Sequence, residues 1–97
     1  MVMSSNLLYI TIIKGGTMKA FDYEGRRNVS GDRIREARVK YRYSQAELAA
    51  KAQCEGVILE QDAISRIESG NRMVQDYELR AFANLLGVTT DWLLAND

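Results

Sequence analysis

The side chains that enzymes most often use for catalysis are scarce in this sequence. It has no histidine, so the usual general base near neutral pH is missing, and Cys54 is its only cysteine. A structural zinc site needs several Cys or His ligands. We recognise no nucleophile–base pair and no phosphate-binding glycine loop, and Gly15-Gly16 alone indicates neither. We therefore expect no enzyme, no cofactor and no bound metal, and an inert Cys54 thiol.

Electrostatic binding is the other chemistry that the residue types allow. The chain has no net charge, but its charges are unevenly distributed. Residues 26–42 carry a net charge of +5, and residues 43–97 carry −5. The basic side chains of the first stretch are Arg26, Arg27, Arg33, Arg35, Arg38, Lys40 and Arg42. Such a strip is compatible with phosphate contact on one face, and equally with a solvated helix whose charges have no function.

The N-terminal part of the chain differs from the rest. The length fits one domain, and we predict an extension over residues 1–29 and a folded domain over residues 30–97. The apolar run over residues 7–13 indicates a short strand or a sticky tail, and it is far too short to span a bilayer. Residues 14–18 (KGGTM) can be encoded by a ribosome-binding site followed by a start codon. Met18 is therefore a candidate start, which would make residues 1–17 non-native.

Two helices are predicted between residues 30 and 55. Ser30 can cap the first, whose apolar stripe is Ile34, Ala37 and Tyr41. The second opens at Ser44-Gln45-Ala46-Glu47, a capping box, and places Leu48, Ala49 and Ala52 on one side. Gly56 marks a break, and residues 53–59 form a connector that is longer than a tight turn.

Three further helices follow the connector. The third runs from about Gln61 to Glu68, and Gly70 is a left-handed stop just after it. The fourth is capped by Asp76, ends at Gly87, and has the apolar stripe Leu79, Phe82, Ala83 and Leu86. Thr89 or Thr90 caps a short fifth helix. Its Trp92 is expected to lie in the core, with a dimer contact as the alternative.

Three segments of this pattern resemble the repressor/Cro family of helix-turn-helix proteins, often called the XRE family. Residues 44–51 (SQAELAAK) resemble its second helix, residues 64–72 (ISRIESGNR) its third helix and exit loop, and residues 86–94 (LGVTTDWLL) its closing segment. The resemblance covers about Ser30 to Leu94. It implies an all-α, five-helix, lambda-repressor-like bundle that contains a helix-turn-helix and is preceded by an N-terminal tail.

The resemblance also implies which side chains would meet DNA. Gln45, at the start of the second helix, would bond a phosphate, although it can also be read as a solvated first-turn residue. The third helix would enter the major groove. The side chains near the start of that helix that would reach base edges are Gln61, Asp62, Ser65 and Arg66. For Arg66, an ion pair with Asp62 is the alternative.

Four more residues receive roles from the same resemblance. Asn71 and Arg72, in the exit loop, would meet the DNA backbone. Arg38 and Glu68 match a pair that forms a salt bridge between the first and third helices in the family, where it positions the third helix. This pair would be structural and would not read bases.

Two features depart from the family pattern. The distance from Ser44 to Ile64 is about five residues longer than usual, so the turn carries an insertion that lengthens the second helix or loops outward. Glu60 replaces the usual Ser or Thr cap of the third helix and stands close to Asp62. Two acids at the end that faces DNA repel phosphates, so they either enforce selectivity or indicate another partner.

The favoured interpretation is a cytoplasmic, sequence-specific regulator of transcription that binds double-stranded DNA as a homodimer. The alternative is a protein-interaction module with the same fold, such as an antitoxin-like partner or an anti-repressor target. In that case Glu55, Glu60 and Asp62 would face a protein. An enzyme is the weakest of the three interpretations.

Overall fold

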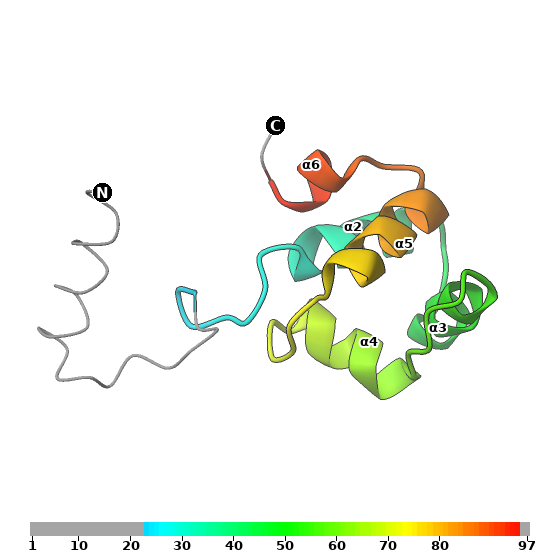
Figure 1. Ribbon diagram of the computed structural model, residues 1–97, viewed down its shortest axis with the longest axis horizontal. Helices are drawn as coiled ribbons and strands as arrows, with labels where there is room; N and C mark the ends of the chain where they lie inside the picture. The colour runs from blue at the N-terminus through cyan, green and yellow to red at the C-terminus, as the bar shows by residue number, and fades with distance from the viewer. Residues whose placement is uncertain (1–22, 96–97) are drawn as a thin grey trace, which may run out of the picture.

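Five helices account for most of residues 23–95, the part of the chain that the structure, a computed structural model, describes (Figure 1). They are α2 (Gly31–Lys40), α3 (Gln45–Cys54), α4 (Gln61–Glu68), α5 (Asp76–Leu86) and α6 (Thr90–Leu93). The predicted all-α, five-helix fold is confirmed. The apolar run over residues 7–13 and the candidate start Met18 lie outside the described residues. Among residues 23–95, none of the helices has the length and hydrophobicity needed to cross a membrane.

Most helix ends follow local signals in the sequence. Ser44 caps α3 through a capping box: its Oγ accepts from the Glu47 amide at 3.0 Å, and Glu47 Oε1 accepts from the Ser44 amide at 2.7 Å. Gly70 follows α4 with a φ of +84° and Gly87 ends α5 with a φ of +64°. Both are left-handed conformations that glycine adopts without steric cost. Thr89 caps α6 by accepting from the Trp92 amide at 3.0 Å.

Three local predictions were wrong. Ser30 stands at the N-cap of α2 but its side chain caps nothing, because Asn28 Oδ1 accepts from the Gly31 amide in its place, at 2.8 Å. The N-cap of α5 is Gln75, and Asp76 is the first residue of the helix. Tyr41 lies beyond the end of α2 and is half-exposed, stacked on the Tyr43 ring with the centroids 5.7 Å apart.

The predicted apolar stripes meet in one core. α4 packs against α2 and α3, and α2 also packs against α5 and α6. The largest fully buried side chains come from all five helices, namely Ile34, Leu48, Ile64, Ile67, Phe82, Leu86 and Leu93. Each contributes about 1.5–3 kcal/mol relative to an exposed position. Trp92 packs half-buried against this core, with the Arg33 guanidinium 4.9 Å from its ring centroid.

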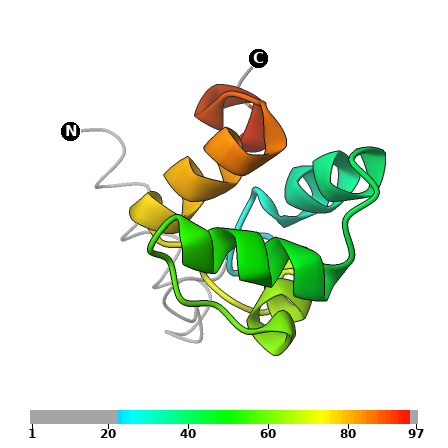
Figure 2. The same ribbon diagram turned by 90° about the vertical axis from the view of Figure 1, so that its right-hand side faces the viewer.

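The connector between α3 and α4 follows a longer helix than expected from the sequence. α3 continues to Cys54, so the connector is residues 55–60 and begins two residues later than predicted. Val57 and Leu59 are buried in the core, whereas Ile58 between them is 74% exposed. The alternation shows that the connector packs on the bundle as an extended segment. Figure 2 shows α3 and α4 together at the lower part of the bundle, joined by this connector.

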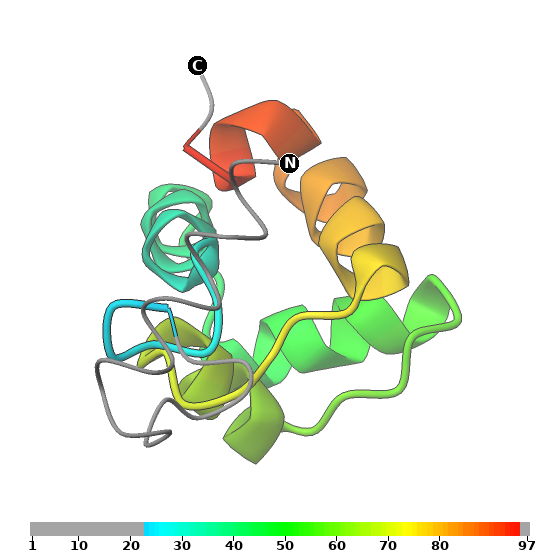
Figure 3. The ribbon, with the colours of Figure 1, turned by 60° about the vertical axis from the view of Figure 1, so that its left-hand side comes forward.

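The segment before α2 is part of the folded unit. Residues 23–29 turn back on themselves through a bridge between Tyr23 and Arg26, and then run beside the C-terminal end of α4 (Figure 3). The Arg27 amide donates to Gly70 O at 2.8 Å. Residues 26–28 therefore pack against the helical bundle.

Candidate nucleic-acid interface

The outer side of α4 is open to solvent. Its inner side buries Ile64 and Ile67, while Gln61 and Ser65, one turn apart, are exposed. The three ribbon views agree that α4 lies at the lower edge of the bundle (Figures 1 to 3). Neither the inserted connector nor the segment before α2 covers these two side chains. The helix therefore presents a free polar face, which is the geometric requirement for insertion into a groove.

Asp62 and Arg66 share this face and are paired with each other. Their side chains are 80% and 56% exposed, and Arg66 Nε lies 3.5 Å from Asp62 Oδ2. An exposed i, i+4 pair of this kind contributes about 0.3–0.5 kcal/mol, so it holds Arg66 only weakly. The guanidinium is free to exchange Asp62 for another acceptor. Glu60, directly before α4, is also exposed and adds a second negative charge at this end.

The N-terminus of α3 lies near the C-terminal end of α4. The capping box fixes the first turn of α3 and lowers the pKa of Glu47, chiefly through the hydrogen bond from the Ser44 amide. Gln45, partly exposed, donates from Nε2 to Glu68 Oε1 at 3.1 Å. The side chain predicted to bond a phosphate is therefore held by a carboxylate of α4 in the free protein.

Arg38 and Glu68 form a buried ion pair between α2 and α4. Arg38 Nε lies 2.6 Å from Glu68 Oε2 and Nη2 lies 2.9 Å from Oε1, with side chains 11% and 4% exposed. The hydrogen bond to Glu68 raises the pKa of Arg38 above its ordinary value. Arg38 Nη1 also donates to Tyr43 O at 2.8 Å, just before α3. This pair therefore connects α2, α4 and the residue that lies just before α3.

The two exit-loop residues differ in their surroundings. Asn71 is exposed, and its Nδ2 donates to Ser69 Oγ at 3.2 Å. Arg72 instead makes two hydrogen bonds to Glu78, at 3.0 and 3.2 Å, and Glu78 is buried near the start of α5. The Arg72 guanidinium, on a side chain that is 27% exposed, is thus paired with Glu78 in the free protein and links the exit loop to α5.

The sequence analysis missed the contribution of Arg26 and Asn28. Asn28 is buried and bonds the last turn of α4, and Arg26 reaches the same turn. Only the start of the basic strip at Arg26 pointed to this segment, and nothing in the sequence singled out Asn28. Among the described residues, no three His, Cys, Asp or Glu side chains gather as a metal site.

Comparison with known proteins agrees with this geometry. A helix-turn-helix family model (HTH_3) matches residues 34–93, more than half of the chain. The crystal structure of the P22 c2 repressor protein in complex with synthetic operator 9T, in the presence of Tl⁺, is similar with a TM-score of 0.61 and 31% sequence identity. The match covers 72% of this chain and 98% of that one. No curated protein matches the chain. The chain therefore belongs to the helix-turn-helix family and is a phage-repressor-like (XRE-type) helix-turn-helix protein with a lambda-repressor-like fold.

Proposed function

We propose that this helix-turn-helix protein, a sequence-specific DNA-binding regulator of transcription, reads duplex DNA by placing α4 in the major groove. The observation that carries the proposal is the free outer face of α4, where Gln61 and Ser65 are exposed at the edge of the bundle. Eight residues give a rod about 12 Å long, a size that a major groove admits. The similar P22 c2 repressor structure is a complex with a synthetic operator, which supports DNA as the partner.

Each side chain of the outer face has a matching base edge. Gln61 can bond the N6 and N7 groups of adenine together, and Ser65 can donate or accept at either purine or pyrimidine edges. Asp62 accepts from cytosine N4. Arg66 leaves its weak pair with Asp62 to bond guanine or a phosphate. These four residues are our candidates for sequence readout.

Phosphate contacts come from the ends of the neighbouring elements. The N-terminus of α3 offers free amides and a positive dipole end, and Gln45 lies in its first turn. Asn71 supplies an exposed amide at the other end of α4. Arg72 acts indirectly, because its bonds to Glu78 fix the exit loop that carries Asn71. We propose phosphate binding by Gln45 and Asn71, and a positioning role for Arg72.

The acids Glu60 and Asp62 weaken binding to DNA in general. Both are exposed at the start of α4, where they repel the phosphates of any duplex. A base pair that gives Asp62 a donor and frees Arg66 offsets this repulsion, and other base pairs do not. We infer that the acids raise selectivity at the expense of affinity.

A single α4 contacts few base pairs, so we propose that the protein binds as a homodimer on an inverted repeat. Two half-sites read on one face of the duplex stand about 34–36 Å apart, or a multiple of that. The symmetry of the protein dimer then appears as the symmetry of the site.

Binding to a pool of genomic fragments at several salt concentrations tests this function. We expect enrichment of fragments that share an inverted repeat, with an affinity that falls steeply as salt rises. Gln45→Ala should weaken binding to every sequence by roughly ten- to a hundredfold, since a hydrogen bond to a charged group contributes about 1.5–3 kcal/mol. Gln53→Ala, at the exposed far end of α3, is the matched control and should bind normally.

One combination of results would contradict this proposal. If no fragment is enriched at low salt, and the full chain instead binds one protein tightly, the acidic end of α4 is a protein-binding surface and the regulator proposal is wrong.

A further inference from the structure

The last turn of α4 is closed by residues from outside the helix. A helix leaves its final carbonyl groups without partners in the next turn. Here the Asn71 amide bonds Arg66 O at 2.8 Å and the Gly70 amide bonds Ile67 O at 3.0 Å. Glu68 O takes its bond from the Arg26 side chain, which precedes α2 in the sequence. The segment before α2 therefore completes the C-terminal end of α4.

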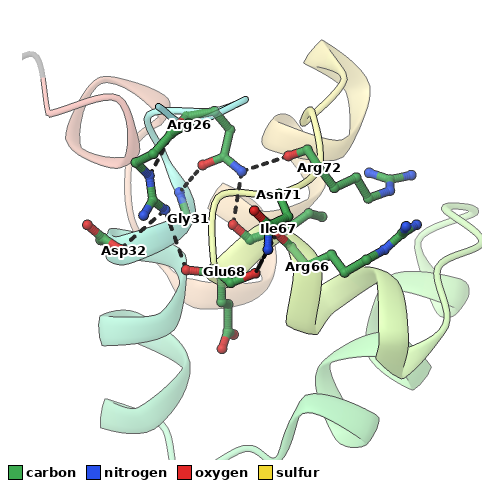
Figure 4. Close-up of polar contacts among 10 residues, drawn as sticks. Arg26, Gly31, Asp32, Arg66, Ile67, Glu68, Asn71 and Arg72 are labelled. Carbon is green, nitrogen blue, oxygen red and sulfur yellow. Dashed lines mark hydrogen bonds and ion pairs between the residues drawn. The ribbon is translucent and has the colours of Figure 1, made fainter. Parts of the chain in front are cut away.

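Asn28 makes three hydrogen bonds at this junction (Figure 4). Its Nδ2 donates to Ile67 O at 2.9 Å and to Arg72 O at 2.7 Å, and its Oδ1 accepts from the Gly31 amide at 2.8 Å. One buried amide thus joins the end of α4, the exit loop and the start of α2. No other side-chain type of this size has two donors and an acceptor in this arrangement.

Arg26 and Arg27 extend the same attachment. Arg26 Nη2 lies 3.4 Å from Glu68 O and 3.3 Å from Asp32 Oδ1, so its charge stands at the negative dipole end of α4. The Arg27 amide donates to Gly70 O at 2.8 Å. Figure 4 shows the Arg26 guanidinium between the start of α2 and the end of α4.

The backbones of α2 and α4 approach closely at Gly31, where an added Cβ would stand 2.1 Å from Ile67 O. At Gly70 an added Cβ would stand 2.6 Å from Arg26 Cζ, the end of a side chain. The position of α4 relative to α2 is therefore fixed by short polar contacts in addition to the apolar core.

We propose that Arg26, Arg27 and Asn28 form a clip that sets the orientation of α4 for sequence readout, with Asn28 as the main positioning residue. The clip holds the C-terminal end of α4 and the exit loop as one body, so that Gln61 and Ser65 meet base edges while Asn71 meets a phosphate. Without the clip, α4 stays packed through Ile64 and Ile67 but turns about that contact. Non-specific binding tolerates such freedom, whereas bonds to base edges do not.

This inference rests on the proposed function, and its test uses two readouts of the full chain. The variant is Asn28→Ala. The control is Leu93→Ala or Leu93→Val, whichever matches it in thermal midpoint, because Leu93 is buried in α6, which packs on α2 and α5, and its apolar side chain makes no hydrogen bond. The first readout, without DNA, is hydrogen exchange. We expect the Gly70 and Asn71 amides to exchange at least tenfold faster in Asn28→Ala than in the control.

The second readout is the ratio of dissociation constants for poly(dI–dC) and for the inverted-repeat duplex that the unaltered protein selects. Asn28→Ala should lower this ratio about tenfold, which corresponds to roughly one lost hydrogen bond to a base, and the control should keep it. If Asn28→Ala does not fold, Arg26→Ala is measured against the same control, with a smaller decrease of about threefold expected.

Different results would contradict the proposed function and the clip. If the unaltered protein selects no duplex, the proposed function is wrong and the exchange readout alone decides on the clip. Exchange at Gly70 and Asn71 equal to the control, or an unchanged binding ratio despite faster exchange, overturns the clip as a positioning device.

Discussion

Replacing Arg38 with alanine should lower the free energy of unfolding by about 3–5 kcal/mol, the largest loss we expect from any polar substitution in this domain. The Glu68 side chain, 4% exposed beside Arg38, then loses its cationic partner and keeps only the bond from Gln45 at 3.1 Å as a side-chain contact. It also removes the bond to Tyr43 O. Urea denaturation near neutral pH measures the loss directly.

Two further variants distinguish the cost of leaving Glu68 charged and buried without Arg38 from the cost of losing an ion pair as such. Asp62→Ala breaks the exposed pair with Arg66 and should change stability by less than about 0.5 kcal/mol. The double variant Arg38→Met/Glu68→Leu removes both buried charges and should recover most of the stability lost in Arg38→Ala. An Arg38→Ala protein as stable as the Asp62→Ala protein would contradict the structural role given to this ion pair.

The second large effect is expected at Gly31. Alanine there places a methyl carbon 2.1 Å from Ile67 O and 2.9 Å from Asn28 Oδ1, so α2 and α4 must separate. We expect a loss of about 3 kcal/mol, from overpacking together with weakened hydrogen bonds of Asn28, even though alanine favours helices. Thermal and urea unfolding measure it.

Gly56 provides the matched control for this substitution. It has a φ of +82° and no atom within 4 Å of an added Cβ, so Gly56→Ala carries only the strain of a left-handed residue, about 1 kcal/mol. Equal losses at Gly31 and Gly56 would mean that the close approach of α2 and α4 is not rigid.

Features coded by neighbouring residues could be predicted from the sequence. The capping box between Ser44 and Glu47 sets the start of α3, and the left-handed Gly70 sets the end of α4. Both signals act within one turn of a helix, so both can be read from neighbouring residues. The apolar spacing of Ile64 and Ile67 also determines which side of α4 is free. The outer face with Gln61 could therefore be predicted from the spacing of these apolar residues.

Features that depend on distant partners could not be predicted in the same way. Asn28 bonds residues 39 and 44 positions away, and nothing near it in the sequence marks it as buried. Arg72 was predicted to meet the DNA backbone from the resemblance to the repressor/Cro family. Its partner Glu78 becomes visible only when α5 folds back on the loop. Ser30 lost its predicted capping role to a near neighbour, because Asn28 Oδ1 accepts from the Gly31 amide three residues along the chain.

The inserted connector could be predicted only in part. Its extra length follows from the sequence, whereas the sequence does not tell whether it covers the outer face of α4. Burial of Val57 and Leu59 holds the connector on the bundle and leaves Gln61 and Ser65 uncovered. The connector therefore leads into α4 without closing the face that we propose for DNA.

The most direct test of the outer face of α4 is the base preference of a Gln61→Ala protein. The preference is measured on a randomised inverted-repeat duplex, beside that of the unaltered protein. Loss of one bidentate contact should relax the preference at a single position in each half-site by about 1–3 kcal/mol and leave the other positions unchanged. A uniform loss of affinity over all positions, or a profile identical to that of the unaltered protein, would show that α4 does not lie in the groove as we propose.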